Sequence, residues 1–281
     1  MLKAQTVFVN PVGKKMIRLV VCAAVALPAQ IFVAQTEVQQ NFHDQAVTLM
    51  QQQIGLDTNL PNERNPEGLR IRFQKIQENQ QPTGRSVQYR LLIPGAPEKE
   101  KYTLTVWRIG VDMKDTPAPV YTNAKGLLIW QLPTAEQEDK DTLDKADEVE
   151  IDLKAARGEP IRYMLRSQDG RLFFPGTIVP YPIEGKDGNC RLEVRLAFPE
   201  GQAMLVFADG LPPGAQVPMH MASEGQTHDS KMKADALGHA VSVVSPAVPG
   251  TNAGVAKISV ALPGCSVAVD VPWGDGSYRP L

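Results

Sequence analysis

Signatures of catalysis and of cofactor binding are missing from this sequence. It contains no G-x-S-x-G nucleophile motif, no P-loop, no G-x-G-x-x-G dinucleotide fingerprint, no H-E-x-x-H zinc motif and no EF-hand loop. Its 29 basic residues do not outnumber its 31 acidic residues. Nucleic-acid binding needs a basic surplus, so these counts argue against it. We therefore expect a protein that is not an enzyme, has no cofactor and has no nucleic-acid partner.

Aromatic residues, cysteines and long apolar runs are also scarce. Aromatic residues make up 6% of the chain, and there are three cysteines. The apolar run at residues 19–29 is shorter than the roughly 20 residues that a membrane helix needs. Proline and glycine, in contrast, are plentiful at 23 and 22 residues, and they separate short segments. This composition favours β-structure with frequent turns.

Residues 1–35 have the features of an export signal. A positively charged stretch from Lys14 to Arg18 precedes the apolar run, and Met16 would give a more typical signal start than Met1. Cleavage would follow one of three alanines, namely Ala26, Ala29 or Ala34. The segment predicts a periplasmic or extracellular protein. The alternative is an uncleaved anchor, and only then would the protein contact a membrane.

One segment has the pattern of an amphipathic helix, at residues 36–54. Its apolar residues recur at spacings of three and four, which places them on one face: Val38, Phe42, Ala46, Leu49 and Met50. Such a helix either packs on the first folded module or pairs with another helix. A polar linker rich in proline and asparagine follows and extends to residue 68.

From residue 69 the pattern changes to strict alternation of apolar and polar residues. Alternation places one face of a strand on a core and the other in water, as in an antiparallel sheet. The strands expected in a first module, residues 69–186, are 69–76, 86–93, 101–107, 126–132, 149–153 and 161–166. The charged segment 134–148 is expected to be a solvated loop.

A second module is expected at residues 187–274, followed by a short tail at 275–281. Its expected strands are 191–196, 203–208, 215–222, 239–244, 255–261 and 266–271. Cys190 and Cys265 open the first and the last of these strands after a turn. Removing the signal removes Cys22 and leaves these two, which predicts a disulfide in an oxidising compartment. Two free buried thiols are the alternative.

The two modules resemble each other, and both end on Val-Pro followed by an aromatic residue, Tyr181 or Trp273. The second module carries a G-x-P-P-G turn at residues 210–214 and an A-D-A-x-G turn at 234–238. With these turns the chain resembles the immunoglobulin-like repeats of secreted bacterial proteins. The resemblance implies two tandem immunoglobulin-like antiparallel β-sandwiches, and adhesion, scaffolding or accessory binding rather than one activity.

The best chemical lead in the sequence is Met219-His220-Met221. Thioether and imidazole groups suit Cu(I), so a copper-handling protein is one hypothesis. In a strand, however, the two methionines point to one face and the histidine to the other. The alternative is that the methionines fill the core while His220 faces solvent.

A second set of residues falls at the junction between the modules: Phe173, Tyr181 and Trp273. They would either pack one sandwich on the other or line a groove for a peptide or glycan. The first functional hypothesis is thus an exported, non-enzymatic protein that binds a protein or glycan in the cell envelope through its surface. The alternatives are a carbohydrate- or peptide-binding accessory module and a copper-handling protein.

Overall fold

The structure is a computed structural model, and it describes residues 65, 67–81, 84–130 and 148–279. Three of the expected segments lie outside the described residues. They are the export signal at 1–35, the amphipathic helix at 36–54 with nearly all of its linker, and all but the last residue of the charged segment 134–148.

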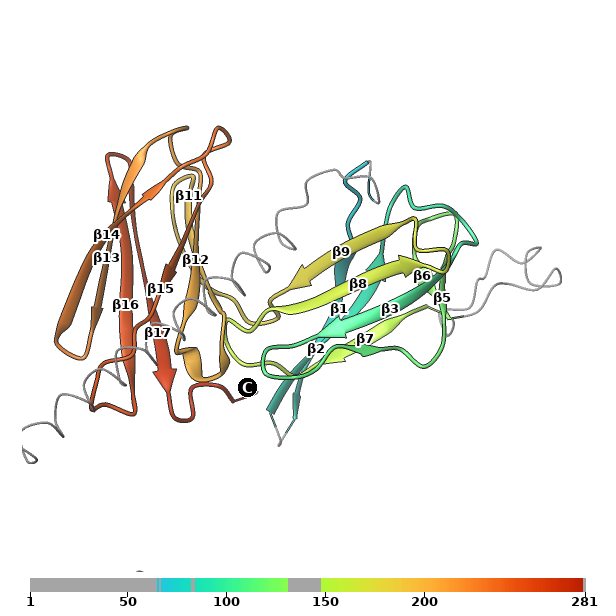
Figure 1. The fold of residues 1–281 in the computed structure, drawn as a ribbon, viewed down its shortest axis with the longest axis horizontal. Helices are drawn as coiled ribbons and strands as arrows, with labels where there is room; N and C mark the ends of the chain where they lie inside the picture. The colour runs from blue at the N-terminus through green and yellow to red at the C-terminus, as the bar shows by residue number, and fades with distance from the viewer. Residues whose placement is uncertain (1–64, 66, 82–83, 131–147, 280–281) are drawn as a thin grey trace, which may run out of the picture. The chain divides into compact units, whose positions relative to one another are not determined.

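The described residues form an all-β protein, as predicted. They contain no α-helix, and their strands assemble into four sheets whose strand pairings are all antiparallel (Figure 1). Their one helical turn is a 3-10 turn at Pro199–Gly201. The four sheets form two sandwiches, each with its own hydrophobic core.

The first module consists of a three-stranded and a six-stranded sheet. The smaller sheet has the order β1 (Arg72–Gln81), β2 (Gly84–Leu92) and β7 (Glu150–Leu153). The larger has the order β6 (Leu128–Ile129), β5 (Val120–Thr122), β3 (Lys101–Trp107), β8 (Ile161–Ser167) and β9 (Phe173–Ile178), with β4 (Lys114–Asp115) paired to β3.

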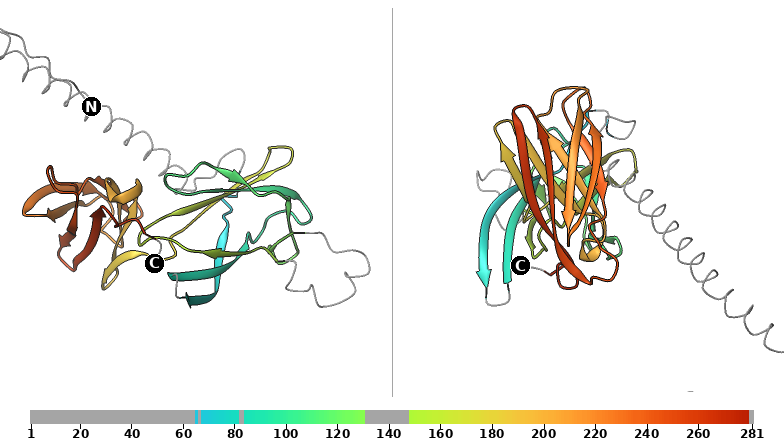
Figure 2. Two further views of the ribbon diagram at one scale, coloured as in Figure 1. Left: turned by 90° about the horizontal axis from the view of Figure 1, so that it is seen from below. Right: turned by 90° about the vertical axis from the view of Figure 1, so that its left-hand side faces the viewer.

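The second module consists of two four-stranded sheets, which Figure 2 shows from two further sides. One has the order β10 (Ile183–Asp187), β11 (Cys190–Leu196), β12 (Met204–Asp209) and β15 (Ala240–Val244). The other has the order β14 (Gln226–Lys233), β13 (Gln216–Ser223), β16 (Ala253–Leu262) and β17 (Cys265–Gly274).

The same chain path recurs in both modules. In the first, β1-β2-β7 faces a sheet that contains β5-β3-β8-β9; in the second, β11-β12-β15 faces β14-β13-β16-β17. Each module thus places its first, second and fifth main strands in one sheet and the others in the second sheet. This is a Greek-key arrangement of the immunoglobulin-like kind, which the repeated sequence pattern predicted. β10 is an additional edge strand of the second module.

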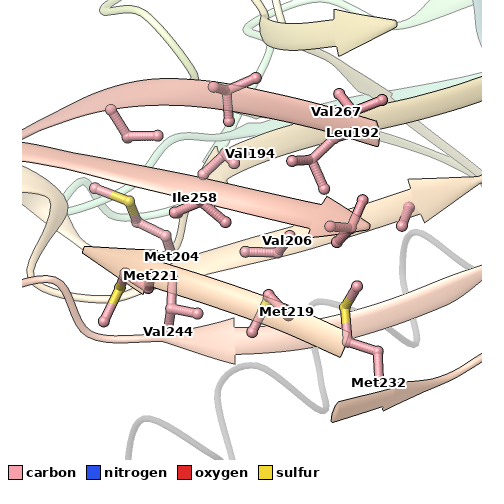
Figure 3. Packing of buried hydrophobic residues seen from close by; sticks show 14 of the residues in the cluster. Leu192, Val194, Met204, Val206, Met219, Met221, Met232, Val244, Ile258 and Val267 are labelled. Atoms are coloured by element: carbon pink, nitrogen blue, oxygen red, sulfur yellow. The ribbon is translucent and has the colours of Figure 1, made fainter. Parts of the chain in front are cut away.

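Alternating side chains build the core of the second module. In the hairpin of β16 and β17, Ile258 and Val260 on one strand and Val267 and Val269 on the other are buried, whereas the residues between them are partly or fully exposed. Valines and isoleucines from both sheets meet methionines from β12, β13 and β14 in this core (Figure 3). The β-branched residues suit the strands, and the unbranched methionines fill the gaps between them.

The turns that carry the immunoglobulin-like resemblance lie against each other in the structure. The Leu211 N–H donates to the Gly238 carbonyl at 3.1 Å, and the Gly214 N–H donates to the Asp235 carbonyl at 3.2 Å. A Cβ on Gly210 would lie 2.0 Å from the Asn189 carbonyl oxygen. Glycine is therefore required at that turn by contact as well as by its positive φ of 74°.

The connection between the modules is very short. Tyr181 belongs to the core of the first module and Ile183 to the core of the second, so Pro182 alone separates the two. The expected boundary between residues 186 and 187 falls inside β10. Because β10 pairs with β11, its residues lie in the second module.

Candidate functional site

A disulfide joins Cys190 to Cys265, and the two Cα atoms are 5.6 Å apart. The bridge connects the start of β11 in one sheet to the start of β17 in the other. Beside it, the Ser266 N–H donates to the Asp187 carboxylate at 2.8 Å. The pairing predicted from the sequence is confirmed, and it closes one side of the second sandwich. A structural disulfide of this kind is typical of an oxidising compartment.

Met219 and Met221 lie in the core of the second module, and both are at most 8% exposed. Figure 3 shows their side chains among the core valines and isoleucines. His220 lies on the opposite face of β13, where its Nδ1 is 2.7 Å from an oxygen of Asp229 on β14. The structure therefore separates the imidazole from the two thioethers, which is the arrangement that strand alternation favours.

The described residues also contain no group of three or more histidine, cysteine, aspartate or glutamate side chains that could hold a metal ion. Methionine is the other donor of the copper hypothesis, and both methionines are in the core. The described residues therefore do not favour the copper hypothesis.

Phe173, Tyr181 and Trp273 are not brought together. Phe173 begins β9 and is half-buried, and Tyr181 is buried in the core of the first module. Trp273 is 3% exposed and lies in the core of the second module. Its indole N–H donates to the Ser223 hydroxyl at 2.9 Å. Tyr181 and Trp273 are therefore buried in separate cores.

A groove that the sequence did not predict opens in the second module, with a volume of about 340 Å³. It lies where the edge strand of one sheet, β14, approaches the edge strand of the other, β15. The lining residues come from β13, β14, β15 and the segment after β15: Met221, Ser223, Gln226, Thr227, His228, Val243, Val244, Ser245, Pro246, Ala247 and Val248.

Buried hydrogen bonds fix the floor of this groove. Trp273 on β17 donates to the hydroxyl of Ser223 on β13, and that hydroxyl donates to the Pro246 carbonyl at 2.7 Å. The chain thus ties the segment after β15 to the opposite sheet. Because both partners of Ser223 are buried and well placed, the wall formed by residues 245–248 has a defined position.

The groove presents apolar, hydroxyl, amide and imidazole groups. Its lining carries one imidazole, that of His228, and no carboxylate. The Ser223 hydroxyl is engaged by Trp273 and Pro246. Apolar side chains such as Met221 and Val244 share the lining about equally with polar groups, which include hydroxyl and amide groups.

The sequence held little signal for the groove. β14 (QTHDSKMK) is exposed at most positions and does not alternate, so its sequence did not indicate a strand. Pro246, Ala247 and Val248 form an apolar stretch that resembles a turn between strands. Only the fold shows that this stretch and the start of β14 face the same space.

No described helix is both long enough and apolar enough to cross a membrane.

Neither the known protein families nor the curated proteins include a match to this chain. Solved structures similar to it include the tetra-tandem repeat in the extending region of a large adhesion protein. That likeness has 8% identity and a TM-score of 0.24, and covers 74% of this chain and 50% of the other.

Two further similar structures are enzymes. Red sea bream transglutaminase has 9% identity and a TM-score of 0.21, over 68% of this chain and 29% of the other. A pullulanase from an Anoxybacillus species, complexed with maltotriose, has 7% identity and a TM-score of 0.18, over 69% and 24%. The chain thus spans half or less of each of these proteins, and at these TM-scores the likenesses assign no function.

Proposed function

We propose that this is an exported, non-enzymatic protein that acts through surface interactions. Its partner is a protein of the cell envelope, which presents an extended segment to the groove between β14 and β15. The export pattern at residues 1–35 and the Cys190–Cys265 disulfide support placement outside the reducing cytoplasm. The lack of catalytic motifs in the sequence supports a binding role.

One observation carries the choice of an extended polypeptide. β14 and β15 each stand at the end of their sheet order, so each has one backbone edge without a ladder partner among the described strands. Such an edge offers N–H and C=O groups to an added strand. The groove between the two edges supplies an apolar floor for every second side chain of that strand.

The same lining favours a peptide over a glycan. The groove is lined by no phenylalanine, tyrosine or tryptophan, the large flat rings on which a sugar packs. The aromatic residues that the sequence offered for this purpose include Tyr181 and Trp273, and both are buried in cores. A peptide, in contrast, needs only strand edges and apolar pockets.

The proposal is tested by panning a random dodecapeptide display library against the mature protein. We expect enrichment of strand-forming peptides with alternating apolar residues. Binding of an enriched peptide, measured by calorimetry, should fall at least roughly tenfold in His228→Trp, because the indole fills the groove from β14. Tryptophan is well tolerated in strands, so the module should still fold.

The adjacent residue provides a matched control. Asp229 lies on the opposite face of β14, is exposed and does not line the groove, so Asp229→Trp should leave peptide binding unchanged. Equal loss in both variants, or enrichment of no peptide, contradicts the proposal. Retention of the protein on polysaccharide columns that persists in His228→Trp would instead indicate a glycan-binding role outside the groove.

A further inference from the structure

The joint between the two modules contains a buried carboxylate, that of Glu159, in the segment between β7 and β8. Its side chain is 1% exposed. Arg108 at the end of β3 donates to both carboxylate oxygens, from Nε at 2.8 Å and from Nη2 at 2.9 Å. The Ala156 N–H adds a third hydrogen bond at 2.9 Å. All three of these donors come from the first module.

The fourth donor comes from the other end of the chain. Tyr278, which follows the last strand of the second module, donates its hydroxyl to Glu159 at 2.8 Å. The Ile109 carbonyl lies 3.3 Å from the same hydroxyl. Burial raises the pKa of Tyr278, and its hydrogen bond to Glu159 raises it further. The phenol therefore remains a hydrogen-bond donor throughout the physiological pH range.

Further contacts cross the same joint. Ile109 follows β3 of the first module but packs in the core cluster of the second. The Leu196 N–H at the end of β11 donates to the Gly158 carbonyl at 2.8 Å. Gly158 itself lies close to Ile183, so a Cβ there would be 2.9 Å from that side chain. Together with the one-residue connection at Pro182, these contacts restrict the movement of one module relative to the other.

The buried Glu159 side chain favours the arrangement of the joint in which all of its hydrogen bonds are made. An ionised group removed from water is tolerated only when its hydrogen bonds are complete, and removing one partner is strongly unfavourable. Arg108 and Ala156 leave room for one more donor on Glu159, and Tyr278 supplies it. The position of the C-terminal segment is therefore specified by the need of Glu159 for a donor.

We propose that residues 275–279 form a strap that locks the two sandwiches together through the hydrogen bond from Tyr278 to Glu159. With the strap in place, the joint does not bend, and the groove of the second module keeps a fixed orientation to the first module. With the strap released, the modules move about the connection at Pro182, as tandem domains with small contacts do. This inference does not rest on what the groove binds.

Pulsed electron–electron double resonance, which measures the distance between two spin labels, tests the strap on the mature protein. Spin labels are placed at Lys125→Cys in the first module and Lys231→Cys in the second, two exposed positions, while Cys190 and Cys265 remain linked. We expect a single narrow distance distribution. In Tyr278→Phe and in a chain that lacks residues 275–281, the distribution should broaden about twofold.

Ser277→Ala is the matched control, because the Ser277 hydroxyl donates to the Gly274 carbonyl at the end of β17, in the same module. It should keep the narrow distribution. Glu159→Gln should broaden it; if that variant does not fold, Tyr278→Phe and the truncation still decide the outcome. A distribution that is already broad in the unaltered protein, or that stays narrow without Tyr278, overturns the proposal. Peptide binding to the groove should be unchanged in Tyr278→Phe, which separates the two proposals.

Discussion

At the scale of single residues, position on a strand outweighs chemical type. Met219, His220 and Met221 have side chains that suit copper, yet alternation along β13 sends two into the core and one into solvent. Trp273 falls at the expected junction of the modules, where it would pack or line a groove, but it lies near the end of β17 inside the core. Both alternatives were visible in the sequence, and only the burial of each side chain decides between them.

Replacing Trp273 with alanine should destabilise the second module by about 3–5 kcal/mol. The change leaves a cavity at a residue that is 3% exposed and removes the N–H donor to Ser223. Chemical denaturation followed by circular dichroism measures the loss. Val255→Ala, at a valine that is 53% exposed on β16, should change stability by about 0.5 kcal/mol at most. A Trp273→Ala protein as stable as the unaltered one would show that this side chain does not support the core.

At the scale of elements, the sequence predicted the long strands in which buried and exposed residues alternate. The expected strand at 101–107 coincides with β3, and those at 161–166 and 191–196 differ from β8 and β11 by one residue. β14 was missed because it is an edge strand exposed on both faces over much of its length. β9 was missed because Pro175 and Gly176 signal a turn. Proline and glycine are tolerated there because β9 is the edge strand of its sheet. On that edge the Ile71 N–H donates to the Pro175 carbonyl.

The groove could not be predicted for the same reason. It requires β14 and the segment after β15 to lie together, and neither has a periodic pattern. The disulfide, in contrast, followed from an even count of cysteines and their position at strand starts. Local patterns thus identified the long alternating strands, whereas several short or edge strands and the surfaces between edge strands emerged only from the complete fold.

Two glycines of the G-x-P-P-G turn should respond differently to alanine. Both have a positive φ, of 74° at Gly210 and 73° at Gly214, so each substitution costs about 1–2 kcal/mol for the backbone. At Gly210 the new Cβ would also collide with the Asn189 carbonyl, whereas nothing lies within 4 Å of it at Gly214. Gly210→Ala should therefore cost about 1–3 kcal/mol more in thermal or denaturant unfolding. Equal losses would contradict the turn contact described above.

Asp169, in the turn between β8 and β9, should titrate at unusually low pH. The Ser167 hydroxyl donates to Asp169 at 2.6 Å, and this bond, with the donors of Arg171, lowers the pKa of Asp169 from 3.8 to about 2. A lowered pKa stabilises the turn above pH 3.8, and this stabilisation is lost as the pH falls through 2. Carboxyl carbon shifts in an NMR titration measure the pKa. In Ser167→Ala it should rise, and an Asp169 that already titrates near 3.8 in the unaltered protein would contradict this account.

At the scale of the whole molecule, the two modules share one strand topology but differ in how their two sheets are joined. The second has a disulfide between its sheets, whereas the first has no cysteine and relies on contacts such as that of Ile71 with β9. The second module also carries the groove and the C-terminal strap. Stability of the part that we propose to bind a partner therefore depends on the redox state of the compartment that holds it.

Deleting residues 1–35 should change both the compartment of the protein and the stability of its second module. The complete chain is expected outside the cytoplasm with its signal removed after Ala26, Ala29 or Ala34, and with Cys190 and Cys265 linked. The deleted form should stay inside with free thiols, and its second module should be less stable by about 4 kcal/mol, because the bridge that closes a loop across a sequence separation of 75 residues is absent. Mass spectrometry of alkylated cell fractions measures both the cleavage point and the thiols, and denaturant unfolding measures the stability.

Oxidising the purified deleted form should restore the lost stability, whereas a Cys190→Ala, Cys265→Ala variant should not respond to oxidant. Free thiols in the exported form, or retention of the complete chain in the cytoplasm, would contradict export as the reason for the bridge.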